Sequence, residues 1–166
     1  MPPSVERRMV RVLVVYSKTF YFVDQGTQRG ASYDVFKAFE DELNETLKTK
    51  HVRVHVVFVP VSRDELLPAL VAGKGDVAAA NLTITPERQK TVDFASPIFG
   101  GVSELVVTGP QSPRIEVLDD LAGKEVFVRR SSSYHESLLA LNDRFRAEGK
   151  AEVRITPAPE SLEDED

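Results

Sequence analysis

The residues best suited to chemistry lie together within residues 81–97. Thr85 and Pro86 are typical of a helix start, because a hydroxyl can accept hydrogen bonds from free backbone N–H groups and proline suits the first helical position. Arg88 falls in that first turn, a short distance after Thr83. A planar guanidinium beside hydroxyls and free N–H groups is suited to bidentate binding of a small anion. The segment therefore predicts a site for a carboxylate.

Arg88 taken alone supports a simpler interpretation. Most charged side chains are solvated at the surface, and Glu87 or Asp93 could pair with it there. The order of residues around Arg88 favours the anion site. That order runs through Asp76, the alanines at 78–80, Asn81, Thr83, Thr85, Arg88, Asp93, Phe94, Ser96 and Pro97.

This order resembles the signature of family 3 periplasmic solute-binding proteins, which is shared by the ligand-binding cores of ionotropic glutamate receptors. Three further segments, KTFYF at 18–22, VFVPVSRDELLPAL at 57–70 and SSSY at 131–134, are most similar to the solute-binding module of membrane-bound lytic murein transglycosylase F and its relatives. The resemblance implies an α/β fold with two lobes, mainly parallel sheets and a ligand held between the lobes.

The resemblance also implies roles for residues of the 81–97 segment. Arg88 is expected to bind the α-carboxylate of a ligand, helped by Thr83, and Asn81 to lie where a carbonyl or polar side chain meets an α-amino group. The charges match an amino acid or the end of a peptide. Asp76 and Asp93 are expected to hold the loop that carries Arg88.

A second group of polar residues lies later in the chain. By the same resemblance, Ser132 and Ser133 align with hydroxyl residues whose N–H groups, at a helix N-terminus, approach the ligand carboxylate. Ser133 with Glu136 also forms a capping-box pattern, so a plain helix cap is the alternative. One helix end can serve both purposes.

Aromatic residues follow the first predicted strand. Tyr16, Phe20 and Tyr21 lie where the family places aromatics against the apolar part of a ligand, although three aromatics so close together are as often a core patch. Arg63 occupies a position where amino-acid binders often carry an aromatic. This departure favours a longer or more acidic ligand than a small free amino acid.

Composition limits the function classes. The chain has 166 residues, 42% hydrophobic and 28% charged, which is typical of a globular protein. Acidic residues number 26 against 21 basic ones, but five of the acids lie in an acidic tail at 160–166, so the rest is balanced. No basic stripe with interleaved aromatics indicates nucleic-acid binding. With no cysteine, disulfides and thiolate metal sites are impossible.

No cofactor or metal is expected. His51, His55 and His135 lack nearby carboxylates in a recognisable ligand order and are interpreted as surface histidines. No apolar run approaches the ~18 residues that a membrane-spanning helix needs, and no signal peptide begins the chain. The resemblance implies an export signal or lipid anchor upstream, a periplasmic location, and outer-membrane association through a parent protein.

Hydrophobic periodicity predicts alternating strands and helices in the first part of the chain. Strands are expected at 10–16, 52–59 and 76–80, with a helix carrying Phe36, Phe39, Leu43 and Leu47 after the first. Ser62 and Glu65 form a capping-box pattern before a second helix, which Gly73 ends. Such an order predicts parallel pairing, so the loops after Val15, Val59 and Ala80 should meet at the carboxyl edge of the sheet.

The second part of the chain begins after a predicted strand at 102–108. Gly109, Pro110 and Pro113 break both periodicities, so the expected lobes are 1–109 and 110–166. The second should contain a helical turn at 118–121, a strand at 125–129, a helix with Tyr134, Leu138, Leu141 and Phe145 on one face, and a strand at 153–156. It is incomplete relative to the family fold. We therefore expect exposed apolar surface and self-association.

Three functions follow from the resemblance. The first is a regulatory module that binds an amino-acid-like or cell-wall peptide ligand and is attached to a lytic murein transglycosylase, whose catalytic glutamate lies in a separate module. The second is a free-standing periplasmic amino-acid-binding protein of an ABC transporter. The third is an enzyme, since some dehydratases of aromatic amino-acid precursors share this fold. No catalytic arrangement is evident in the sequence, so a binding module is favoured.

Overall fold

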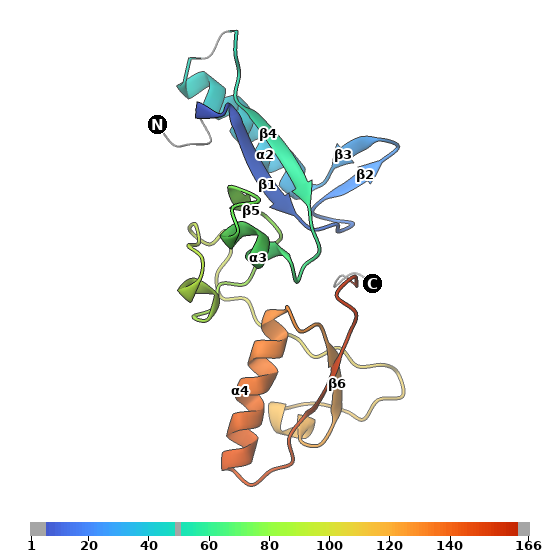
Figure 1. Ribbon diagram of the computed structural model, residues 1–166. Coiled ribbons are helices and arrows are strands. Elements are labelled where there is room, and N and C mark those ends of the chain that lie inside the picture. The colour runs from blue at the N-terminus through green and yellow to red at the C-terminus, as the bar shows by residue number, and fades with distance from the viewer. Residues whose placement is uncertain (1–5, 49–50, 163–166) are drawn as a thin grey trace. The chain divides into compact units, whose positions relative to one another are not determined.

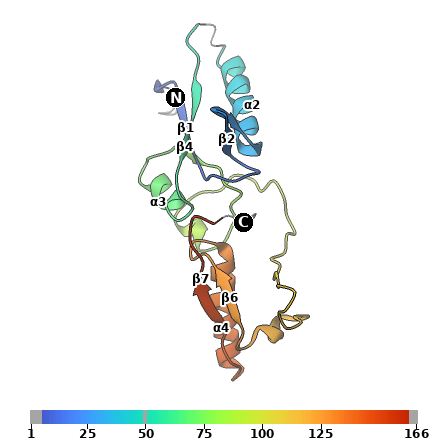
Figure 2. The same cartoon turned by 90° about the vertical axis from the view of Figure 1, so that its right-hand side faces the viewer.

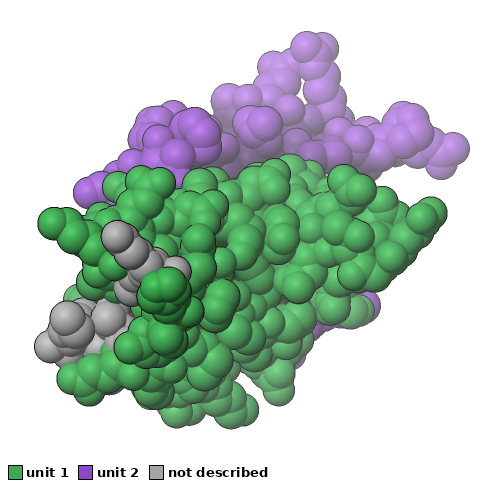
Figure 3. Space-filling model, turned by 90° about the horizontal axis from the view of Figure 1, so that it is seen from above, with its two compact units in different colours: residues 1–93, 161–166 green, residues 94–160 purple. Residues whose placement is uncertain are grey.

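The computed structural model describes residues 6–48 and 51–162. The chain divides into two compact units, residues 1–93 with 161–166 and residues 94–160, which Figure 3 shows in different colours. This division falls on the N-terminal side of the sequence-based boundary at 109. The last four acids of the predicted tail lie outside the described residues.

The first unit is built on a three-stranded parallel sheet (Figure 1). The central strand β1 (Met9–Val14) pairs with β4 (His55–Pro60) on one side and with β5 (Val77–Ala78) on the other. The predicted strands and their parallel pairing are confirmed. β5 is shorter than the predicted strand at 76–80.

Helices cover the two faces of β1. Val10, Val12 and Val14 belong to one core cluster, to which α2 (Ala31–Thr46) contributes Tyr33, Phe36 and Leu43, together with its C-cap residue Leu47. The alternate residues Leu13 and Val15 join a second cluster with Leu66 and Ala69 of α3 (Leu66–Val71). Successive side chains of a strand point to opposite faces, so a run of apolar residues is buried on both. Figure 2 shows α2 running alongside β1 and β4.

A β-hairpin precedes α2 where the sequence predicted only a loop. β2 (Phe22–Asp24) and β3 (Thr27–Arg29) pair antiparallel through the two-residue turn of Gln25 and Gly26. Both turn residues have positive φ, 48° and 83°, which is the conformation that two-residue hairpins favour. Glutamine at the first turn position is an uncommon signal, which explains why the hairpin was missed.

The start of α3 differs from the prediction. Its N-cap is Glu65 and no side chain caps it, so the predicted capping box of Ser62 with Glu65 is wrong. Instead the Glu65 backbone N–H donates to the Ser62 carbonyl at 3.2 Å. The predicted stop is confirmed, because Gly73 has φ 70° and its N–H donates to the Leu70 carbonyl.

The second unit contains a β–α–β arrangement. A 3-10 turn η2 (Leu118–Leu121) precedes β6 (Glu125–Val128), which is parallel to β7 (Arg154–Pro157), and α4 (Ser133–Ala147) connects the two strands. The core consists of Leu121, Phe145 and Val153. These elements match the predicted ones closely.

The predicted strand at 102–108 is wrong. This segment has no regular secondary structure and joins no sheet among the described residues. Residues with high β-propensity form a sheet only when a partner strand lies beside them, and no described strand pairs with this segment. Leu105 and Val107 are 86% and 93% exposed, so the prediction of exposed apolar surface is confirmed.

In the described part of the chain, none of the helices combines the length and the apolar character needed to span a membrane.

Candidate functional site

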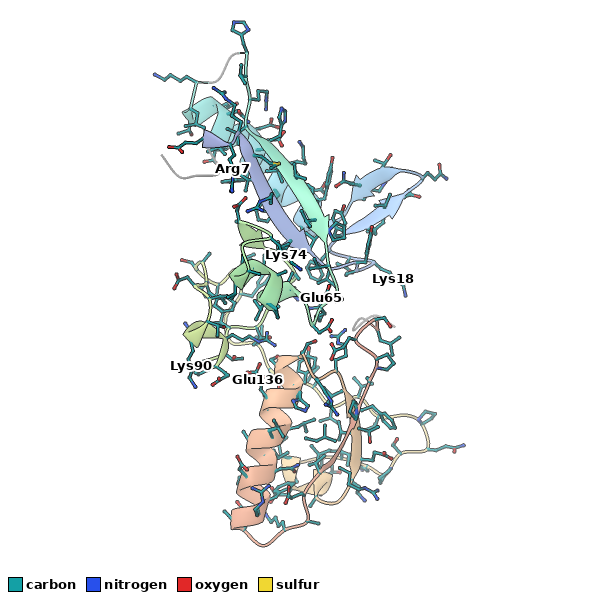
Figure 4. All side chains as sticks on the ribbon, in the orientation of Figure 1. Arg7, Lys18, Glu65, Lys74, Lys90 and Glu136 are labelled. Atoms are coloured by element: carbon teal, nitrogen blue, oxygen red, sulfur yellow. The ribbon has the colours of Figure 1, made fainter. Side chains whose placement is uncertain are left out.

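Arg88 opens a single 3-10 turn, η1 (Arg88–Lys90), at the end of the loop that follows β5; Lys90 is labelled in Figure 4. The Thr85 hydroxyl accepts a hydrogen bond from the Arg88 backbone N–H at 3.3 Å, and the Thr85 carbonyl accepts one from the Gln89 N–H at 3.0 Å. The helix start predicted at Thr85 and Pro86 is therefore a short turn held by the Thr85 hydroxyl.

The Arg88 side chain is buried, with 8% of its surface exposed. Its Nη1 donates to the Thr83 carbonyl at 3.2 Å, so the structure brings Arg88 and Thr83 together through the backbone. A buried cation is costly unless hydrogen-bonded. A guanidinium has five N–H donors, so a single arginine side chain can donate both to a loop carbonyl and to an anionic ligand.

The loops after β4 and β5 meet, as the parallel sheet predicts. Arg63, three residues beyond β4, donates from Nη1 to the carbonyl of Ala80, which lies just beyond β5, at 3.2 Å. The Val61 N–H donates to the Val14 carbonyl at 2.9 Å and joins the ends of β4 and β1. Arg63 therefore helps to build the loop region on the carboxyl side of the sheet.

Asn81 is exposed and has φ 48°, in the left-handed region. Few residues other than glycine adopt this conformation, and asparagine is among those that tolerate it best. Asn81 follows Ala80 directly, so the chain turns sharply at the point where the predicted ligand-binding loop begins.

The aromatic residues separate into core and surface positions. Tyr21 is 3% exposed, stacks on Phe58 at 5.5 Å, and donates from its hydroxyl to Gln28 Oε1 at 3.0 Å. Burial raises its pKa. Tyr16 is 54% exposed and lies with its ring centroid 5.7 Å from that of Tyr21. Phe20 is half-buried. Tyr21 is thus a core residue, whereas Tyr16 offers a ring face at the surface.

Asp76 does not hold the Arg88 loop, which corrects the prediction. Its carboxylate accepts hydrogen bonds from the Arg11 backbone N–H at 2.9 Å, from Arg11 Nη2 at 3.0 Å, and from Arg7 Nη2 at 2.7 Å; Arg7 is labelled in Figure 4. The Arg11 side chain lowers the Asp76 pKa to about 2. Asp76 therefore ties the start of β5 to β1. Asp93 stays a prediction.

In the second unit, Ser132 caps α4. Its Oγ accepts a hydrogen bond from the His135 N–H at 3.3 Å and donates to the Arg129 carbonyl at 2.9 Å. The predicted capping box on Ser133 and Glu136 is therefore one residue out of register. Ser133 is the first residue of the helix, and both serines are buried. Glu136 lies in the first turn (Figure 4).

Glu160 has a structural role that its position in the predicted acidic tail does not indicate. Its Oε1 accepts a hydrogen bond from the Ser131 N–H at 3.2 Å and its Oε2 one from the Ser131 Oγ at 2.5 Å. No sequence motif indicates this pair. The only available signal is that Ser131 and Glu160 lie two and four positions beyond the strands predicted at 125–129 and 153–156.

Within residues 6–48 and 51–162 no cluster of His, Cys, Asp and Glu could hold a metal ion. The predicted binding residues divide between the two units. Unit 1 contains Tyr16, Phe20, Tyr21, Arg63, Asn81, Thr83 and Arg88, and unit 2 contains Ser132 and Ser133.

Comparisons with known proteins agree with this organisation. The family described as bacterial extracellular solute-binding proteins, family 3, matches residues 10–154. Membrane-bound lytic murein transglycosylase F of Maricaulis maris is 36% identical over 121 residues, which cover 71% of this chain and 24% of that protein. The protein of the same name from Idiomarina loihiensis is 31% identical over 140 residues, which cover 83% of this chain and 29% of that protein. The chain thus spans about a quarter of these relatives.

Two solved structures support the fold. An ancestral arginine-binding protein bound to arginine has a TM-score of 0.66 and 29% identity, covering 92% of this chain and 61% of its own. An ancestral amino-acid-binding protein, described as a precursor of cyclohexadienyl dehydratase, has a TM-score of 0.69 and 27% identity. The match covers 93% of this chain and 62% of that protein. The predicted periplasmic-binding-protein-like α/β fold is confirmed, and the chain spans about three fifths of it.

Proposed function

This chain belongs to family 3 of the bacterial extracellular solute-binding proteins, and from that premise we propose that it binds the α-carboxylate of an amino-acid-like or cell-wall peptide ligand. The observation that carries the proposal is the burial of Arg88 at the end of the loop after β5, with Nη1 on the Thr83 carbonyl. A buried guanidinium on the carboxyl side of a parallel sheet is suited to a small anion.

Other residues of the first unit fit this role. Asn81 starts the same loop in a left-handed conformation, which is uncommon and often associated with functional sites. Tyr16 presents an exposed ring that can cover the apolar part of a ligand. Arg63 is fixed by the Ala80 carbonyl and adds a second cation near the loop, which favours a ligand with more than one anionic group.

Ser132 and Ser133 supply the contribution of the second unit. They form the N-terminus of α4, where backbone N–H groups and the helix dipole favour a carboxylate. We propose that the ligand binds to both units and that closure of one upon the other follows from this shared contact.

The parent protein is proposed to be a periplasmic lytic murein transglycosylase in which this module senses a cell-wall fragment. The similarity to transglycosylase F proteins supports this role. The alternative is a free-standing amino-acid-binding protein of an ABC transporter, which the likeness to an arginine-binding protein favours. A lysozyme-like module encoded downstream in the same reading frame would support the first. A reading frame that ends after a complete second lobe would support the second.

Calorimetric titration tests the binding proposal. The 166-residue chain is titrated with L-arginine, L-glutamine and purified muropeptides, and the best ligand is then tested against Arg88→Ala and Arg88→Lys. Loss of the charged pair should cost about 2–5 kcal/mol of affinity. Lysine should restore only part of it, because it cannot bind a carboxylate in a bidentate manner.

Arg53→Ala is the matched control, since Arg53 is an exposed arginine paired with Asp41. It should bind as the unaltered chain does. Circular dichroism of each variant distinguishes lost binding from lost folding. A folded Arg88→Ala protein with unchanged affinity would remove Arg88 from the site and contradict the proposal.

A further inference from the structure

Glu160 and Ser131 join the two loops at the carboxyl edge of the β6–β7 sheet. The strands are parallel and in register, with Val128 opposite Pro157 as the last pair. Ser131 and Glu160 lie three residues beyond these positions, one on each chain segment. The Ala158 N–H still donates to the Val128 carbonyl at 3.0 Å, so the two segments stay side by side as they leave the sheet.

The contact uses both oxygens of the carboxylate. Oε1 accepts from the Ser131 N–H at 3.2 Å and Oε2 from the Ser131 Oγ at 2.5 Å. Hydrogen bonds to an ionised carboxylate are stronger than neutral ones. A two-point contact also fixes the direction of the Ser131 backbone, which a single hydrogen bond would not do.

Ser131 directly precedes the residues proposed to meet the ligand. Ser132 is the N-cap of α4 and Ser133 its first residue, and both are buried. Ser132 is itself held to the Arg129 carbonyl by its N–H at 3.2 Å and by its Oγ at 2.9 Å. The loop 130–132 is thus fastened from one side by Arg129 and from the other by Glu160.

We propose that Glu160 is a positioning residue of the ligand site, which holds the 130–132 loop so that the N-terminus of α4 is presented in one conformation. The inference rests on the proposed function. A loop ordered before binding loses less conformational entropy when the ligand arrives, so affinity is higher than for a mobile loop. Glu160 acts through Ser131 and does not itself contact the ligand.

A competing role for Glu160 gives the opposite result. If its negative charge lay close enough to repel the ligand carboxylate, removal of the charge would strengthen binding. The variants Glu160→Ala and Glu160→Gln separate the two roles. Alanine removes both hydrogen bonds, whereas glutamine keeps an acceptor for the Ser131 N–H and offers a donor to the Ser131 Oγ.

The first measurement is amide hydrogen exchange of Ser131 by NMR in the ligand-free chain. We expect Glu160→Ala to speed exchange at Ser131 about tenfold, and Glu160→Gln to restore most of the protection. Glu125→Ala is the matched control, because Glu125 lies on the same strand pair and accepts from Thr156 Oγ1 at 2.7 Å, but at the start of β6. It should leave Ser131 unchanged.

The second measurement is the affinity for L-arginine or, if it binds more tightly, L-glutamine. Positioning predicts about three- to tenfold weaker binding for Glu160→Ala and near-normal binding for Glu160→Gln and Glu125→Ala. Unchanged Ser131 exchange in Glu160→Ala, or tighter binding by either Glu160 variant, would overturn the inference. An unaltered chain that binds neither these amino acids nor the purified muropeptides would count against the proposed function, and the exchange data would still decide whether Glu160 fastens the loop.

Discussion

Asp76 shows how one carboxylate can connect two strands of a sheet. It accepts hydrogen bonds from the backbone and side chain of Arg11 on β1 and from Arg7 just before it. Its own N–H donates to the Arg11 carbonyl at 2.8 Å. β5 contains only Val77 and Ala78, so its position depends strongly on this neighbouring residue.

The first prediction concerns the pH dependence of this contact. The Asp76 pKa lies at about 2, below its ordinary value of 3.8. A depressed carboxyl pKa stabilises the folded state above the unfolded pKa, and this stabilisation is lost as the pH falls from about 4 to about 2. The Asp76 side chain is 20% exposed, so solvent screens its ion pairs, and we expect them to contribute about 1 kcal/mol to the free energy of unfolding. Asp76→Asn should therefore lower the free energy of unfolding at pH 7 and have little further effect near pH 2.

Urea unfolding at both pH values checks this expectation, and hydrogen exchange of β1 amides is measured as a second test. Asp119→Asn is the comparison, because Asp119 also pairs with two cations, Arg144 and Lys150, but is half-exposed. It should change stability less than Asp76→Asn at pH 7. Equal effects of Asp76→Asn at both pH values would show that packing, not charge, is responsible.

Single residues of the site could be predicted unevenly from the sequence. The Thr85 hydroxyl was expected to cap a turn and does so, because that interaction is local. The partner of Asp76 could not be predicted, since Arg11 lies 65 residues away and meets it only through sheet pairing. The cap of α4 was misplaced by one residue because three consecutive serines offer equivalent capping hydroxyls.

At the scale of elements, both units use the same asparagine contact between a helix and a strand. Asn44 of α2 donates to the Val54 carbonyl at 2.8 Å and accepts from the Val54 N–H at 2.8 Å. Asn142 of α4 does the same with Val153, at 2.9 and 2.7 Å. In each case the valine is buried and directly precedes a strand, β4 for Val54 and β7 for Val153. The side chain amide therefore takes the place of a neighbouring strand.

The second prediction follows from this shared contact. Asn44→Ala and Asn142→Ala each remove both hydrogen bonds of a buried backbone residue, which should cost about 2–4 kcal/mol. The loss should be confined to the unit that carries the substitution. Hydrogen-exchange mass spectrometry of peptides from β4 and β7 measures the two units separately.

Asp143→Ala is the control for α4, because Asp143 is exposed and forms a surface ion pair with Arg146. It should change exchange in β7 little. If Asn142→Ala opened both units equally, the two would unfold as one cooperative body and the prediction of local destabilisation would fail.

Element types were predictable where the pattern was long and its partners were near. The apolar runs of β1 and β4 and the periodicity of α2 indicated the first β–α–β unit, because packing against β1 needs those patterns. The β2–β3 hairpin was missed, since its strands have only three residues each and little burial. The strand predicted at 102–108 lacks a partner, which local sequence cannot reveal.

At the scale of the whole molecule, the segment 98–107, which includes most of the wrongly predicted strand, exposes apolar side chains. Apolar side chains of Ile98, Val102, Leu105 and Val107 are 75–93% exposed. Exposed apolar surface together with a backbone that joins no sheet among the described residues favours association by strand addition. Glu104 is the only charged residue between Phe94 and Pro113, so little charge repulsion opposes such contacts.

The last prediction is that the 166-residue chain self-associates through this segment. Light scattering should give a mass above that of the 18.5 kDa monomer, increasing with concentration, and a hydrophobic dye should bind. The double substitution Leu105→Lys with Val107→Lys should reduce both signals, because charges block edge-to-edge pairing. Val35→Lys with Phe39→Lys, at exposed apolar positions of α2, is the matched control and should leave association unchanged. A monodisperse, cooperatively melting monomer of the unaltered chain would show that the segment 98–107 is not an association surface.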